Sequence, residues 1–134
     1  MFDSIPDISS FPKTLIHTDI GLHNTVVNSA GEIIFIDWDD AGVGYRILDI
    51  AFPLLSIFVE GNVFNRKCAE AFYKTYFSET HLPLTENEKT ALFDVSLFFC
   101  LIYLPYGNAD KGWERLQKSL TIRESVEDFI SNIY

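Results

Sequence analysis

Apolar positions follow two different patterns along the chain, and the change from one to the other falls near residue 45. Before it, Leu15–Ile16, Thr25–Asn28 and Glu32–Asp37 form short apolar runs rich in β-branched and aromatic residues, which favours strands. Ser29 to Gly31 links the last two runs, and a three-residue loop that ends in glycine is typical of a hairpin. This part of the chain predicts one short strand and one β-hairpin.

From Tyr45 onward, the apolar residues recur with the period of an α-helix. Pro53 should kink the first helix or move its start, and Pro105 with Gly107 should end the longest one. The expected helices cover Ile47–Glu60, Val63–Phe77, a long apolar stretch after the capping box formed by Thr85 and Glu88, Ala109–Ser119 and Ile122–Ile133. The pattern predicts a mostly helical α+β fold, organised as a single domain over residues 1–134.

Composition places the chain among globular proteins and argues against two kinds of partner. Hydrophobic residues make up 48% of it, including 12 Phe, so a packed core is expected. The longest apolar run, Val95–Leu104, is about half the length that spans a bilayer, and predicts a buried helix or an interface, with no membrane partner. The net charge of −9 argues against nucleic acid binding. It permits a cationic substrate.

The two cysteines and the amino terminus point to a reducing compartment. Cys68 and Cys100 lie in apolar helical patterns, which favours buried free thiols over a disulfide or a metal site. In the second helix, Cys68 belongs to a predicted buried stripe with Phe64, Ala71, Phe72 and Tyr76. The amino terminus MFDSIPDISS lacks the basic and apolar segments of a signal peptide. We therefore expect a cytoplasmic protein.

The residues with the clearest chemical meaning lie between the predicted strand and the end of the hairpin. The run HTDIGLHN contains Asp19 and Asn24, and Asp37 follows in FIDWDDAG. Phosphoryl transfer from a nucleotide needs an acid, an amide and a second acid in this order: one carboxylate accepts the proton of the attacking hydroxyl, and the other two groups hold magnesium. Folding of the hairpin should bring Asn24 and Asp37 close together, so that their oxygens bind one Mg²⁺.

Three linked segments carry a family resemblance: LIHTDIGLHNTVV, IDWDDAGVG and LDIA. In order and spacing they resemble the aminoglycoside phosphotransferase and choline kinase superfamily, whose fold is protein-kinase-like. The resemblance implies a kinase carboxy-terminal lobe, with ATP and Mg²⁺ as cofactors and a small-molecule hydroxyl as phosphoryl acceptor. It also implies that Asp19 is the catalytic acid-base group, that Asn24 and Asp37 hold the metal and nucleotide, and that His17 and Asp49 support the loop.

One residue departs from that family pattern, and the roles of two acidic residues stay open. Thr18 stands where the family usually has glycine, so a positive φ at this position would be strained. Asp39 follows Trp38 as an acid does in the family, but a solvated loop acid is an equally good interpretation, and the same holds for Asp40.

The resemblance to a kinase covers the carboxy-terminal lobe only. The 16 residues before His17 are too few for a nucleotide-covering sheet with its glycine-rich loop, and Gly42-Val43-Gly44 does not replace that loop. We therefore expect the amino-terminal lobe to be absent and the chain alone to turn over little. A homodimer or a separate chain that supplies the lobe is expected.

Two alternatives to an active phosphotransferase stay open. One is a catalytically incomplete or truncated lobe that acts as a binding module. The other is a zinc hydrolase that uses His17, Asp19 and His23, although further ligands are hard to find.

Overall fold

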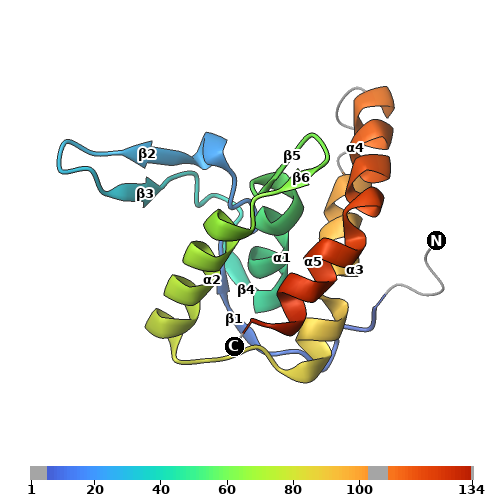
Figure 1. Ribbon diagram of the computed structural model, residues 1–134. Helices are drawn as coiled ribbons and strands as arrows, with labels where there is room; N and C mark the ends of the chain where they lie inside the picture. Colours follow the sequence, from blue (N-terminus) through green and yellow to red (C-terminus); the bar gives the residue numbers. More distant parts are fainter. Residues whose placement is uncertain (1–5, 103–108, 134) are drawn as a thin grey trace.

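The computed structural model describes residues 6–102 and 109–133, and the fold of this part is α+β and mostly helical, as predicted (Figure 1). Five α-helices lie within these ranges. They are α1 (Arg46–Ser56), α2 (Arg66–Thr80), α3 (Glu86–Ile102), α4 (Ala109–Thr121) and α5 (Arg123–Ser131). A short 3-10 helix, η1, covers Leu22–Asn24.

The described strands form three antiparallel pairs. They are β1 (Lys13–Ile16) with β4 (Gly42–Tyr45), β2 (Thr25–Val27) with β3 (Ile33–Phe35), and β5 (Val59–Glu60) with β6 (Val63–Phe64). In the first pair, Ile16 lies opposite Gly42. The whole segment from His17 to Ala41 therefore leaves and re-enters the fold at the same end of this ribbon.

The β2–β3 hairpin has the three-residue loop that the sequence predicts, and it projects from the helical body (Figure 1). Gly31 adopts a φ of +82°, which glycine reaches without a steric penalty. Asn28 organises the turn, because its Oδ1 accepts the backbone N–H groups of Ala30 and Glu32, each at 2.9 Å. Local hydrogen bonding thus fixes the hairpin register.

Helix α1 is central to the hydrophobic core. Its Ile47, Ile50 and Leu54 side chains are almost completely buried, and the helix packs along α3. Two hydroxyl groups from other helices reach its backbone: Tyr73 donates to the Ile50 carbonyl at 2.7 Å, and Ser96 donates to the Ala51 carbonyl at 2.9 Å. These bonds tie α2 and α3 to the helix that begins beside the loop that follows β1.

The predicted capping box is present at the start of α3. The backbone N–H of Glu88 donates to Thr85 Oγ1 at 3.2 Å, and the Glu88 carboxylate accepts from the Thr85 N–H at 2.9 Å. The same carboxylate is completely buried and receives two bonds from the Arg46 guanidinium, at 2.8 and 2.7 Å. Glu88 therefore caps α3 and joins it to the first residue of α1.

Helices α1 and α2 differ from the prediction in their bounds. Helix α1 ends at Ser56 and not at Glu60, because the β5–β6 hairpin follows, with Gly61 at a φ of +59° in its turn. Helix α2 begins at Arg66, where the Asn65 side chain accepts the N–H of Cys68 at 3.1 Å and caps it.

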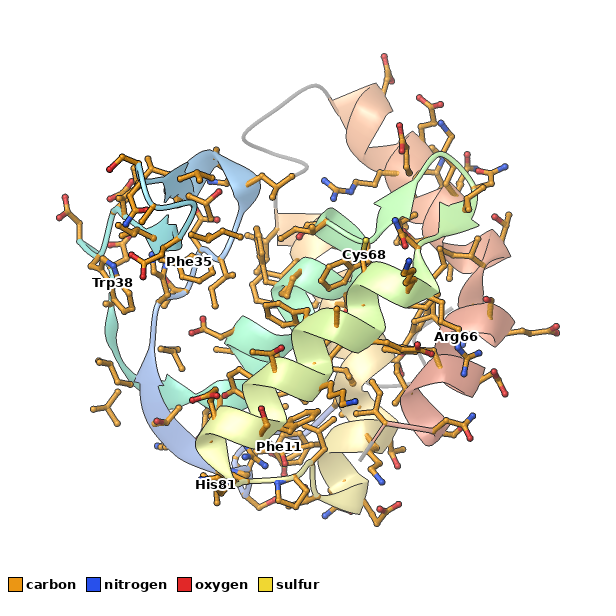
Figure 2. The ribbon with its side chains drawn as sticks, turned by 60° about the vertical axis from the view of Figure 1, so that its left-hand side comes forward. Phe11, Phe35, Trp38, Arg66, Cys68 and His81 are labelled. Carbon is orange, nitrogen blue, oxygen red and sulfur yellow. The ribbon has the colours of Figure 1, made fainter. Side chains whose placement is uncertain are left out.

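The position at which α2 begins determines which of its faces packs against the core. The stripe of residues predicted to be buried is wrong for two residues. Ala69, Tyr73 and Phe77 face the core, whereas Cys68 and Ala71 are exposed. Figure 2 shows Cys68 near the start of α2. Both thiols are free, but only Cys100 is buried, as expected.

The apolar run that begins at Val95 lies in α3 and is mostly internal. Val95, Leu97 and Cys100 are buried, while Phe98 and Ile102 remain partly open to solvent. Pro105 and Gly107, which were expected to end this helix, lie outside the described residues. In the described part of the chain, no helix has both the length and the apolarity that crossing a membrane requires.

Candidate active site

The loop after β1 is held in place by the carboxylate of Asp49, which lies in the first turn of α1. Asp49 Oδ2 accepts the backbone N–H of His17 at 2.6 Å, and its Oδ1 accepts that of Thr18 at 2.8 Å. Burial raises the pKa of the Asp49 carboxyl above its ordinary value, and these two hydrogen bonds offset part of the rise. The bonds tie the loop backbone to the start of the central helix.

His17 joins the same loop to the end of the hairpin. The side chain is buried, and its Nε2 donates to the Ile36 carbonyl at 2.9 Å, while Nδ1 accepts the N–H of Asp19 at 3.4 Å. The imidazole ring also packs against Trp38, with 4.6 Å between ring centroids. Figure 2 shows Trp38 and Phe35 together on the hairpin side of the molecule. His17 thus bridges the segments that carry Asp19 and Asp37.

Asp19 is the hydrogen-bonding centre of the loop. Its Oδ2 accepts from Asn24 Nδ2 at 3.0 Å and from His23 Nε2 at 2.9 Å. Its Oδ1 is buried and has no hydrogen-bond partner. An unpaired buried oxygen on a carboxylate is costly, and in a native site it calls for a functional explanation. One carboxylate oxygen is therefore held by two protein donors, and the other is buried without a partner.

Asn24 and Asp37 lie at corresponding ends of the two hairpin arms. The backbone N–H of Ile36 donates to the Asn24 carbonyl at 2.9 Å, which places the residue before Asp37 directly beside Asn24. The Asn24 amide nitrogen is used by Asp19, both at Oδ2 and at the backbone carbonyl. Within the described residues, the Asn24 amide oxygen and the exposed Asp37 carboxylate have no protein partner, so both can accept a cation.

Two residues of this segment have the left-handed backbone conformation. Thr18 has a φ of 75° and Asp37 a φ of 63°. For the β-branched threonine this is a genuine outlier, and it meets the condition under which the glycine usual in the family predicts strain at this position. Strain of this kind persists where surrounding contacts fix the backbone, and here the Asp49 bonds to His17 and Thr18 do so.

A pocket of about 300 Å³ opens beside Asp19. Its walls combine the loop with the carboxyl half of α1 and one residue of α4, and they are more apolar than polar. The lining residues are Asp19, Gly21, Leu22, His23, Phe52, Ser56, Ile57 and Arg115. Arg115 is held by a bond from its Nη2 to the Leu55 carbonyl at 3.1 Å. Its volume is at the lower end of the range of small-molecule sites, and its position beside Asp19 is what singles it out among the pockets of the described surface.

The sequence alone does not indicate that residues distant in the chain form a pocket beside Asp19. Phe52, Ile57 and Arg115 come from helices far from the loop in the chain, and no local pattern marks them. His23 was considered only as a zinc ligand, although its position four residues after Asp19 was a usable local signal. Among the described residues, no three His, Cys, Asp or Glu side chains form a metal-binding cluster, which leaves the zinc interpretation without a site.

A family profile matches the part of the chain that carries this loop. The sequence profile of the phosphotransferase enzyme family matches residues 1–85, more than half of the 134 residues. The chain therefore belongs to the phosphotransferase enzyme family, and the resemblance to the aminoglycoside phosphotransferase and choline kinase superfamily is confirmed. No curated protein and no solved structure gives a significant match to the chain.

Proposed function

We propose that this chain carries the catalytic loop of an ATP-dependent kinase that phosphorylates a hydroxyl group of a small molecule. The observation that carries the proposal is the state of the Asp19 carboxylate. Two donors hold Oδ2, and Oδ1 is buried, unpaired and part of a residue that lines a pocket. An acceptor hydroxyl in this pocket would donate its hydrogen bond to the Asp19 carboxylate, which would take the proton as the hydroxyl oxygen attacks the γ-phosphorus and ADP leaves.

Asn24 and Asp37 are the residues that would hold magnesium. Hard cations prefer oxygen ligands, and the free amide oxygen and the free carboxylate fit that preference. Mg²⁺ held there would supply positive charge against the phosphates of ATP during transfer. His17 and Asp49 would keep the two segments aligned, because their hydrogen bonds join the loop, the hairpin and α1.

Transfer of radioactive phosphate from [γ-³²P]ATP tests the proposal. The acceptors would be aminoglycosides, choline, amino alcohols and sugars, each with Mg²⁺. Asp19→Asn should abolish transfer, because the amide cannot take the proton. Asp40→Asn is the matched control, because Asp40 is an exposed acid beyond the Trp38 segment, and it should keep the wild-type rate.

A metal-binding measurement separates this function from the binding-module alternative. Mn²⁺ binding, followed by electron paramagnetic resonance, should weaken in Asp37→Asn and become tighter when ATP is added to the wild type. Metal and nucleotide binding without any transfer would favour a catalytically incomplete lobe. If neither metal nor nucleotide binds, the phosphotransferase proposal is wrong.

A further inference from the structure

The hydrogen bond between His23 and Asp19 is not explained by the roles proposed for Asp19, Asn24 and Asp37. His23 Nε2 lies 2.9 Å from Asp19 Oδ2. An ionised carboxylate only accepts hydrogen bonds, so the imidazole is the donor and its proton is on Nε2. Asn24 Nδ2 donates to the same oxygen at 3.0 Å. Both donors converge on Oδ2, and the rotation they impose leaves Oδ1 buried and unpaired.

Gly21 is what admits the His23 ring to this position. A Cβ atom on residue 21 would lie 2.3 Å from His23 Cε1 and 2.5 Å from Nδ1, distances that no real contact reaches. The backbone of Gly21 is extended, with a φ of −113° and a ψ of 161°, which any residue adopts. Backbone conformation therefore does not require glycine here, whereas the placement of the imidazole does.

We propose that His23 is a positioning residue that fixes the orientation of the Asp19 carboxylate for phosphoryl transfer. Gly21, which has no Cβ atom, leaves the room that the His23 ring occupies. The inference rests on the proposed function, since it assigns His23 a role in fixing the orientation of the Asp19 carboxylate beside the acceptor. His23 and Gly21 both line the same pocket as Asp19, so the pair lies where the acceptor would bind. The His23 side chain is otherwise largely exposed, and the Asp19 bond is its only described polar contact.

A mutant cycle on this pair tests the proposal. His23→Ala and Gly21→Ala should each lower the kcat of phosphate transfer by roughly tenfold or more, because the carboxylate loses its fixed rotation. The KM for MgATP should not change. The double variant Gly21→Ala/His23→Ala should be no slower than either single variant, because both remove the same interaction. Additive losses would overturn the proposal.

Rescue by a conservative variant separates positioning from a general structural role. In His23→Gln the side-chain amide can place an N–H donor near the position of Nε2, so most of the kcat should return. In His23→Asn the shorter side chain does not reach Asp19, and the loss should equal that of His23→Ala. Equal kcat values for the Gln and Asn variants would contradict a positioning role.

Nuclear magnetic resonance of the imidazole nitrogens gives a readout that does not need activity. In the wild type, His23 should show a proton on Nε2, and both Asp19→Asn and Gly21→Ala should shift the ring signals. Unchanged ring signals in both variants would show that the pairing is absent and would overturn the proposal. Shifted signals in a wild type that transfers no phosphate would count against the proposed function while supporting the His23–Asp19 pairing.

Discussion

Thr18 has a strained backbone conformation at the point where Asp49 anchors the loop that follows β1. Its φ of 75° is one that side chains with a Cβ atom rarely adopt, and a non-glycine residue there costs about 1–3 kcal/mol. In this conformation the backbone N–H of Thr18 donates a hydrogen bond to Asp49 at 2.8 Å. Any residue with a backbone N–H can make that bond, so the threonine side chain is not needed for it.

Replacement of Thr18 by glycine should therefore stabilise the protein. Relief of the strain exceeds the extra backbone entropy that glycine loses, about 0.5–1 kcal/mol, so we expect a net gain of about 1 kcal/mol. Chemical denaturation would measure it. Thr18→Ala is the control, because alanine keeps a Cβ atom and should gain much less. Equal stability of the glycine and alanine variants would show that Thr18 is not strained.

At the scale of elements, the buried pair of Arg46 and Glu88 joins the starts of α1 and α3. The Arg46 guanidinium also donates to the carbonyls of Leu82 and Pro83, at 2.9 and 2.7 Å, so one side chain ties α1 to the loop that precedes α3. Burial tends to raise the pKa of Glu88, but hydrogen bonds from Arg46 and Thr85 outweigh it and lower that pKa below its ordinary value of 4.5.

Glu88→Gln should destabilise the fold by about 3 kcal/mol at neutral pH, because it leaves the buried Arg46 charge uncompensated. The control is Glu86→Gln on the same helix, whose exposed carboxylate pairs with Lys89 at 3.0 Å and should contribute less than about 1 kcal/mol. Urea unfolding of the three proteins would measure both differences. Similar losses in the two variants would contradict the role given to the buried pair.

The same variant makes a prediction about pH. A carboxyl group whose pKa is lower in the folded state stabilises the fold above its unfolded pKa, and this contribution is lost as the pH falls through the folded pKa. The stability difference between wild type and Glu88→Gln should therefore be constant near neutral pH and shrink below about pH 4.5. A difference that grows on acidification would give the opposite sign and contradict the assignment.

At the scale of the whole molecule, apolar side chains are exposed on the β1–β4 ribbon and on the β2–β3 hairpin. Val27 and Ile33 form a cross-strand pair and are about two-thirds exposed, and the paired Leu15 and Val43 on the ribbon are 64% and 82% exposed. The hairpin stands away from the helices in Figure 1, so the helical body does not cover it. Exposed apolar pairs of this kind are candidate interaction sites on soluble proteins.

We therefore predict that a second copy or a partner chain covers the exposed apolar side chains of the ribbon and the hairpin. The interface should bury roughly 1,200–2,000 Å² in total. Light scattering at micromolar concentration should detect the homodimer. Ile33→Lys should weaken it, whereas Val63→Lys should not, although the two side chains are equally exposed, at 67% and 68%. A wild-type monomer whose hairpin binds no hydrophobic dye would contradict the prediction.

The sequence alone determined the parts of this protein that depend on neighbouring residues. The hairpin turn at Gly31, the capping box of Thr85 and Glu88, and the order of Asp19, Asn24 and Asp37 are all set within a few residues or by a short hairpin. The sequence also marked Thr18 as the place where a positive φ would be strained, because the family it resembles usually has glycine there, and the structure has a φ of 75° at this residue.

Tertiary structure decided the parts that depend on contacts between distant segments. The pairing of β4 with β1, the buried face of α2 and the position of Arg115 in the pocket all result from long-range packing, which no local period encodes. The position of the loop belongs to the same group, because Asp49 of α1 holds the His17 and Thr18 backbone from more than thirty residues away. The donors to Asp19, by contrast, are local, since His23 and Asn24 follow it by four and five residues. Residue types supplied the candidate chemistry, and long-range packing fixed where the loop that carries it lies.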